Sequence, residues 1–185
     1  MKKTIAFDLD SVLADVMIPW IREFNKKYNF NITKRDIIVW DIHTILPITE
    51  IESHNLFSYV WKHKWEKIPP TTENISDILS DLKAENRISI ITRREKDTIP
   101  YVYEWLKRND IEYDDLLFIF DDFQKSMYPF QIIIDDNPSN LIDVKFPKIA
   151  ILYNQPWNNN FKWPKRIDSL NDLEKNNILF SERYD

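Results

Sequence analysis

The stretch Lys3-Thr4-Ile5-Ala6-Phe7-Asp8-Leu9-Asp10 decides the fold of this chain, because it joins a short apolar run to two acids. The apolar run predicts a buried strand that ends at Asp8. In open α/β sheets, ligands bind just beyond the carboxyl ends of the strands. Asp8 and Asp10 therefore occupy a position that suits a functional site.

Further apolar runs follow along the chain, and they alternate with helical patterns. The runs that predict strands are Ile88–Ile91, Leu116–Phe120, Gln131–Ile134 and Ile149–Tyr153. Helical spacing predicts helices over Ile75–Leu82, over Ile99–Lys107 with an end near Asn109, and over Ser169–Asn176. Continuous apolar strands that alternate with helices indicate a parallel sheet covered on both faces. We therefore expect an α/β fold with a doubly wound parallel sheet.

The segment between the first strand and Pro69-Pro70 predicts a separate helical unit. Apolar residues recur at helical spacing after Asp15, which we expect to be the N-cap of that helix. Capping-box patterns at Thr33–Asp36 and Thr49–Glu52 predict two more helices. The two prolines then end the helical segment. We expect a core of residues 1–14 and 69–185, with residues 15–68 inserted as a small helical cap.

Composition excludes several classes of protein. The 185 residues carry a net charge of −5 without a long basic block, so we expect no nucleic-acid polymer as partner. The absence of cysteine excludes thiolate catalysis and zinc–sulfur sites, and the absence of glycine excludes the glycine-rich loops that bind ATP or NAD. Backbone positions that need positive φ must then fall to Asn or Asp. Asp8 and Asp10 interrupt the first apolar run too early for a signal peptide, and no membrane-length span follows, so we expect a cytoplasmic protein.

Chemically useful side chains follow four of the predicted strands. They are Asp8 with Asp10, Thr92, Lys125, and Asp135 with Asp136. A carboxylate can attack phosphorus and form an aspartyl phosphate. Magnesium takes oxygen ligands, for which Asp8 and Asp135 are suited. A nearby lysine keeps a carboxylate charged and binds phosphate, and a threonine hydroxyl with backbone N–H groups completes a phosphate cradle.

These features resemble the four motifs of the haloacid dehalogenase superfamily of phosphatases, which have a Rossmann-like core. The matching segments, in the order of the motifs, are Phe7-Asp8-Leu9-Asp10-Ser11-Val12-Leu13-Ala14-Asp15, Ile88-Ser89-Ile90-Ile91-Thr92, Lys125, and Ile132-Ile133-Ile134-Asp135-Asp136. Their order is that of the superfamily, and together they span most of the chain. One departure is Ser11, because the superfamily usually has glycine at this point of the turn.

The resemblance implies a role for each matching residue. Asp8 is the expected nucleophile and a magnesium ligand, and Asp10 is the expected general acid/base, which also offers its backbone carbonyl to the metal. Thr92 and Lys125 are expected to bind the phosphoryl group. The remaining pair is Asp135, an expected metal ligand, and Asp136, which supports it.

Within the superfamily the chain is most similar to the 5′(3′)-deoxyribonucleotidases. Ala14-Asp15 follows the first motif as it does there, and Lys125 precedes Asp135 by ten residues. The cap stretch Ile32–Asp36, followed by Trp40, resembles a segment with an aromatic substrate contact, and Tyr153–Asn158 resembles a loop after the last core strand. The resemblance implies a magnesium-dependent monomer or homodimer that acts on a nucleoside monophosphate.

Other interpretations stay open from the residues alone. The chain could be a phosphatase or phosphomutase of another small phosphorylated metabolite, or an inactive protein that binds phosphate or a partner. Arg93 and Arg94 are candidate contacts for the phosphate or sugar of a substrate, although a solvated pair is the favoured interpretation. Trp40 is the candidate ligand contact among the aromatic residues, most of which should pack the core of the cap. These aromatic residues are Trp20, Trp40, Phe57, Trp61 and Trp65.

Overall fold

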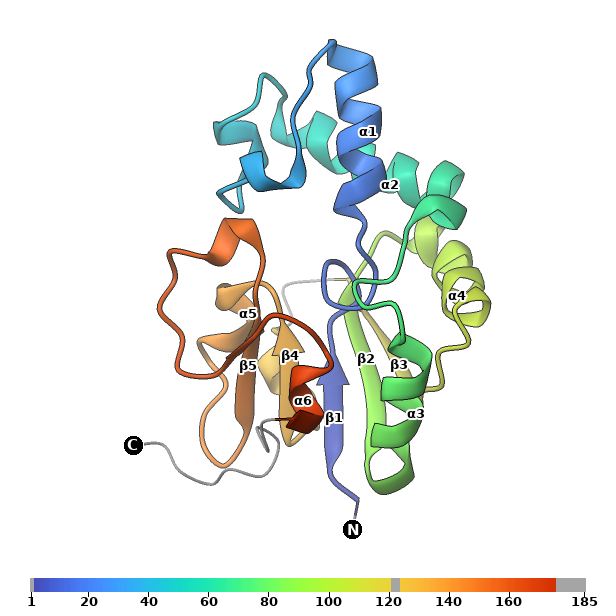
Figure 1. Ribbon diagram of the computed structural model, residues 1–185, viewed down its shortest axis with the longest axis vertical. Coiled ribbons are helices and arrows are strands. Elements are labelled where there is room, and N and C mark those ends of the chain that lie inside the picture. The colour runs from blue at the N-terminus through green and yellow to red at the C-terminus, as the bar shows by residue number, and fades with distance from the viewer. Residues whose placement is uncertain (1, 121–123, 176–185) are drawn as a thin grey trace.

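Six parallel strands form one sheet in the computed structural model, which describes residues 2–120 and 124–175 (Figure 1). They are β1 (Thr4–Phe7), β2 (Arg87–Arg93), β3 (Asp115–Ile119), β4 (Ile132–Asp135), β5 (Ile149–Tyr153) and β6 (Arg166–Ile167). The order across the sheet is β3-β2-β1-β4-β5-β6, and every neighbouring pair is parallel. The α/β prediction is confirmed, and the two-residue β6 is an addition that the apolar pattern did not predict.

The sheet reverses its winding direction beside β1. From β1 the chain moves outward through β2 to β3, and it then returns to the other side of β1 and continues through β4 and β5. Phe7 pairs with Ile90 of β2 on one side and with Ile134 of β4 on the other. Such a reversal leaves a crevice at the carboxyl ends of the strands, where ligands bind in doubly wound folds. Asp8 and Asp135 stand at this crevice.

Side chains alternate between the two faces of the sheet, as they do along any strand. Ile5 and Phe7 belong to a large apolar core that also holds residues of α3 and α4, whereas Ala6 faces a smaller core with Leu141 of α5. Both faces are therefore covered, which explains why the central strands are apolar throughout.

The helices of this half of the chain match the predicted ones closely. The matching helices are α3 (Ile75–Glu85), α4 (Ile99–Arg108) and the shorter α6 (Asp172–Lys175), whereas the short α5 (Pro138–Leu141) was not predicted. Asn176, the last residue of the predicted Ser169–Asn176 helix, lies outside the described residues. Asn137 caps α5, since its side chain accepts a hydrogen bond from the backbone N–H of Ser139 at 2.9 Å.

Two longer helices stand beyond the carboxyl ends of the strands, at the top of Figure 1. They are α1 (Met17–Tyr28) and α2 (Glu50–Lys64), and 3₁₀ turns at Lys34–Asp36, Ile42–Thr44 and Trp65–Lys67 accompany them. Thr49 and Glu52 form the predicted capping box at the start of α2. The Thr33–Asp36 pattern also forms a capping box, but it opens only a single 3₁₀ turn rather than a helix.

The prediction that Asp15 caps the first helix is wrong. The N-cap residue of α1 is Val16, and it has helical backbone angles. The Asp15 carboxylate instead accepts a hydrogen bond from the Lys34 ammonium at 2.7 Å. The other carboxylate oxygen of Asp15, Oδ1, is buried without a hydrogen-bond partner, so the side chain makes no capping hydrogen bond.

Among the described residues, three have positive φ angles, and two of them are the expected types, Asn29 and Asp110. The third is Ser11, with φ of 64°, at the position where the superfamily usually has glycine. The backbone carbonyl of Ser11 accepts a hydrogen bond from the Gln155 side chain at 2.6 Å. This contact from the loop after β5 supports a turn that costs a non-glycine residue about 1–2 kcal/mol.

Within the described residues, no helix is long and apolar enough to cross a membrane.

Candidate active site

Three buried carboxylates meet at the crevice beside β1. Asp8 follows β1, Asp135 ends β4, and Asp136 is the next residue along the chain. One carboxylate oxygen from each lies within 4.8 Å of the other two. Asp8 is 8% exposed, and the other two side chains are almost fully buried. Three acids gathered in this way need positive charge close by, because burial of an unpaired charge is expensive.

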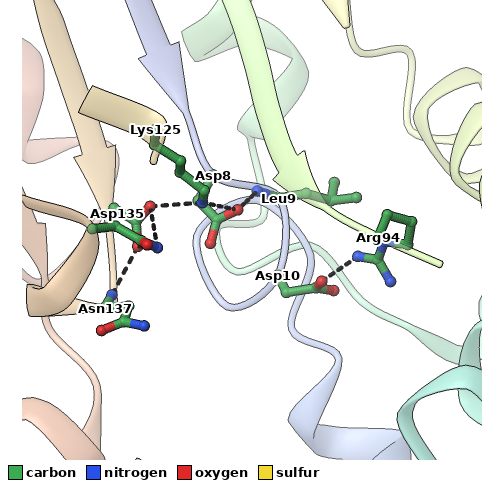
Figure 2. Close-up of polar contacts among 8 residues, drawn as sticks. Asp8, Leu9, Asp10, Arg94, Lys125, Asp135 and Asn137 are labelled. Atoms are coloured by element: carbon green, nitrogen blue, oxygen red, sulfur yellow. Dashed lines mark hydrogen bonds and ion pairs between the residues drawn. The ribbon is translucent and has the colours of Figure 1, made fainter. Parts of the chain in front are cut away.

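Lys125 supplies part of that charge. Its ammonium nitrogen lies 2.7 Å from a carboxylate oxygen of Asp8 and 2.7 Å from one of Asp135 (Figure 2). Lys125 begins the 3₁₀ turn Lys125–Met127 and is buried. Burial alone would lower the pKa of Lys125, but the charges of Asp135 and Asp8 outweigh it and raise the pKa above its usual value. The lysine therefore stays charged.

Asp135 is held in place by the helix that follows it. Its carboxylate accepts a hydrogen bond from the backbone N–H of Asn137 at 2.8 Å and two from the Asn140 amide at 3.1 Å. With Lys125, these donors reach both oxygens of the carboxylate. Asp135 is thus fixed in orientation before any ligand arrives, as a preorganised site requires.

Asp136 has one carboxylate oxygen without a partner. Its Oδ2 accepts a hydrogen bond from the Trp157 indole at 2.9 Å, while Oδ1 is buried and unpaired. Burial, followed by the charges of Asp8 and Asp135, raises the pKa of Asp136 well above its usual range. A buried carboxyl oxygen without a hydrogen-bond partner suits a ligand of a cation, because hard cations bind carboxylate oxygens and favour the ionised group.

The pKa of Asp8 is raised from 3.8 to about 7. Burial is the largest cause, and Lys125 opposes it while the charges of Asp135 and Asp10 add to it. Lys125 alone therefore leaves excess negative charge in the cluster. A divalent cation beside these carboxylates would remove that excess, so the residues present fit a metal such as magnesium.

Asp10 points away from the three-carboxylate cluster (Figure 2). Its Oδ1 accepts a hydrogen bond from the Trp61 indole at 2.9 Å, and its Oδ2 is paired with the Arg94 guanidinium. The expectation that Arg94 belongs to a solvated pair is wrong, since its side chain is only 6% exposed. Trp61 does pack in the buried core as expected, but it also touches a candidate catalytic group.

A cavity of about 810 Å³ joins these groups to the two helices above the sheet. Asp8, Thr92 and Lys125 line its floor, and the half-exposed Trp40 lines the side formed by the inserted segment. Thr92 is buried near the end of β2, and the exposed Arg93 follows it. All of the predicted site residues except Asp135 line this cavity, and Asp135 lies beneath it in the carboxylate cluster.

Sequence reasoning missed Asn140 and Trp157 as parts of the site, and for Arg94 it favoured a solvated side chain over a role in the site. Trp157 lies in a loop that resembles one of the deoxyribonucleotidases, yet nothing local indicates its hydrogen bond to Asp136. Lys148 donates to the backbone carbonyls of Ser126 and Tyr128 at 2.7 and 3.0 Å. It thereby supports the turn that carries Lys125.

Curated proteins named as nucleotidases are similar to this chain. A nucleotidase of Clostridium acetobutylicum is 28% identical over 152 residues, which cover 80% of this chain and 78% of that protein. A 5′(3′)-deoxyribonucleotidase of Bacillus subtilis is 24% identical over 179 residues, which cover 95% of this chain and 98% of that protein.

Solved structures show the same fold. A haloacid dehalogenase-like hydrolase of Streptococcus pneumoniae superposes with a TM-score of 0.67 at 16% identity, over 93% of this chain and 96% of its own. CbbY of Rhodobacter sphaeroides, solved with phosphate, gives 0.62 at 14% identity over 94% and 97%. These likenesses confirm the predicted haloacid dehalogenase-type fold.

The match to one family covers nearly the whole chain. The family model described as 5′ nucleotidase, deoxy (pyrimidine), cytosolic type C protein matches residues 2–182. The match thus extends from the first strand, through the inserted helices, to the C-terminal part of the sequence. With the haloacid dehalogenase-type fold and its four motifs, this match shows that the chain belongs to the 5′-nucleotidase, deoxy (pyrimidine), cytosolic type C family.

Proposed function

We propose that this chain is a magnesium-dependent phosphomonoesterase that dephosphorylates deoxyribonucleoside monophosphates through an aspartyl phosphate on Asp8. The observation that carries the proposal is the buried cluster of Asp8, Asp135 and Asp136, bridged by Lys125 and adjoining one large cavity. Phosphoryl transfer needs positioning and charge neutralisation above all, and this cluster supports both.

Asp8, Asp135 and Asp136 would hold the magnesium ion, with the backbone carbonyl of Asp10 as a further ligand. The unpaired Oδ1 of Asp136 and the excess negative charge around Asp8 support this ligand set. Magnesium, when bound, supplies positive charge that keeps Asp8 ionised and neutralises the phosphate.

In the first step a carboxylate oxygen of Asp8 attacks phosphorus, and the bond from phosphorus to the ester oxygen breaks. The leaving alkoxide takes a proton from Asp10, so the nucleoside departs as a neutral alcohol. Lys125 neutralises charge on the phosphoryl group, and the buried Thr92 supports it with a hydroxyl. Arg93, at the rim of the cavity, is placed to contact the rest of the substrate.

In the second step Asp10, now ionised, takes a proton from a water molecule that attacks the same phosphorus atom. The bond between phosphorus and the Asp8 oxygen breaks, which releases inorganic phosphate and restores both carboxyl groups. Asp10 is suited to these two roles because its carboxylate lines the cavity without belonging to the buried cluster.

The inserted helices support a nucleotide as substrate. The cavity of about 810 Å³ lies within the roughly 300–1,000 Å³ typical of small-molecule sites. Trp40 and Phe57 offer aromatic surface to it, which suits the face of a base. Residues 15–68 would act as the cap that selects this substrate. A cytoplasmic location and a monomeric or homodimeric state belong to the same proposal.

The proposal is tested by measuring phosphate release from a panel of deoxyribonucleotides, ribonucleotides and sugar phosphates, with magnesium or with a chelator. We expect the fastest release from deoxyribonucleoside monophosphates and no release with the chelator. Asp8→Asn should abolish turnover, because the neutral amide has nearly the same shape but is a poor nucleophile. Full activity of Asp8→Asn would overturn the assigned nucleophile.

Two other results would redirect the proposal. Hydrolysis of sugar phosphates alone would remove the nucleotide substrate but retain the chemistry at Asp8. Transfer of the phosphoryl group to a second hydroxyl rather than to water would identify a phosphomutase.

A further inference from the structure

Asp10 is anchored from two sides by residues that no motif includes. The Trp61 indole N–H donates to Oδ1, and the Arg94 guanidinium pairs with Oδ2. Trp61 comes from α2 in the inserted segment, whereas Arg94 directly follows β2 of the sheet. The Asp10 carboxylate therefore sits between the two halves of the molecule and is bound to both.

The two anchors also hold each other. The guanidinium carbon of Arg94 lies 4.5 Å from the centre of the Trp61 ring, within the range of a cation–π contact. Trp61 is fully buried, and it meets Trp105 of α4 edge to face at 6.3 Å between ring centres. Both donors thus come from side chains packed in the interior and not from surface side chains.

This geometry leaves Asp10 able to react. A carboxylate offers about four lone-pair sites, and the two anchors occupy two of them. Asp10 lines the cavity and its side chain is 30% exposed, whereas Trp61 does not line the cavity. Trp61 can therefore act on the reaction only through cavity residues that it contacts, which include Asp10 and Arg94.

We propose that Trp61 and Arg94 are positioning residues for the general acid/base, holding the Asp10 carboxylate in line with the leaving oxygen of the substrate. This inference rests on the proposed phosphatase function. Because Trp61 belongs to the inserted helices, the placement of Asp10 then depends on how α2 packs against α4. Without either anchor, the Asp10 carboxyl group can still donate and accept a proton, but it is no longer held in one orientation.

The test compares two esters that differ in their need for an acid. A nucleoside monophosphate releases an alkoxide that must be protonated, whereas p-nitrophenyl phosphate releases a stable anion that departs without a proton. The readout is the ratio of kcat/KM for the nucleotide to kcat/KM for the aryl ester. This ratio does not depend on the fraction of folded enzyme, so a variant that folds poorly is still informative.

We expect Trp61→Phe and Arg94→Lys each to lower this ratio about tenfold or more, since a misplacement of about 1 Å can cost roughly 10²-fold. Asp10→Asn sets the lower limit of the ratio. Trp163→Phe is the matched control, because it also removes an indole donor, here one bound to the carbonyl of Ala150 at 3.1 Å in an apolar cluster that does not include Trp61. Its ratio should equal that of the wild type.

An unchanged ratio in Trp61→Phe and Arg94→Lys would overturn the positioning role. This outcome includes an equal loss of kcat/KM with both esters. Absence of phosphatase activity in the wild-type enzyme would instead overturn the proposed function itself. The two failures are therefore distinguishable.

Discussion

The ammonium group of Lys125 lies 2.7 Å from a carboxylate oxygen of Asp8, although 117 positions separate the two residues in the sequence. The same nitrogen also contacts Asp135 at 2.7 Å. Among the described residues near the carboxylate cluster, Lys125 is the buried cation that touches two of its members. The charge balance of the proposed site therefore depends strongly on this one side chain.

Replacement of Lys125 by methionine should lower kcat by about 10²-fold or more, as removal of a preorganised charged donor does in other active sites. Methionine has a similar length and keeps the packing, so the loss reports the charge. Lys145→Met removes an exposed lysine from a nearby loop and should leave kcat unchanged. Comparable rates for the two variants would contradict the role given to Lys125.

The metal-free protein should lose stability as pH rises from about 4 to about 7. The pKa of Asp8 is raised from 3.8 to about 7 in the folded state, mainly by burial, so folding favours the neutral carboxyl. This contribution to the free energy of unfolding is complete below the unfolded pKa and disappears as pH rises through the folded pKa. Urea unfolding in chelator across this range measures the effect.

Asp8→Asn is the matched variant for this pH profile, because it cannot ionise. It should be less sensitive to pH over the same interval, and it should exceed the wild type in stability at the upper end. Identical profiles for the two proteins would show that Asp8 titrates normally.

Magnesium should raise Tm more at about pH 8 than at about pH 5, because its carboxylate ligands must be deprotonated before they bind.

Asp136→Asn should weaken magnesium binding by about tenfold or more, as the loss of a group at a metal site commonly does. Asp143→Asn changes an exposed acid close in sequence and should not alter the affinity. Titration calorimetry measures the magnesium dissociation constant of each variant and of the wild type. An affinity of Asp136→Asn equal to that of the wild type would remove Asp136 from the ligand set.

Trp40→Ala should raise KM for a nucleoside monophosphate about tenfold and leave kcat nearly unchanged. The expected loss is that of one base–aromatic stack, worth about 1–3 kcal/mol. Ile51→Ala removes an exposed apolar side chain of α2 outside the cavity and is the control. A fall in kcat without a change in KM would place Trp40 in the chemistry rather than in substrate binding.

The order of strands and helices was predictable because it depends on local patterns. The apolar run before Asp8 and the later runs each match a strand, since buried parallel strands are apolar along their whole length. The Thr49 capping box is equally local and was predicted with its helix. The two-residue β6 was missed because a strand of that length is too short to show an apolar pattern.

Local rules failed where a distant side chain competed for the same group. Asp15 has the right place for an N-cap, but Lys34, which lies 19 residues further along the chain, takes its carboxylate. Arg94 is a charged residue of a type that is usually exposed to solvent, yet its side chain is buried in contact with Trp61 and Asp10. No periodicity or composition encodes such a contact.

The sequence by itself determined which residues stand at the ends of the strands, because strand ends follow from the apolar pattern. Its resemblance to a known superfamily also selected the residues of the carboxylate cluster. Only the tertiary structure decided which donors reach Asp10 and Asp136, because Trp61, Arg94 and Trp157 arrive there through the packing of separate elements. That packing is set by the joint shape of many side chains, which no single stretch of sequence contains.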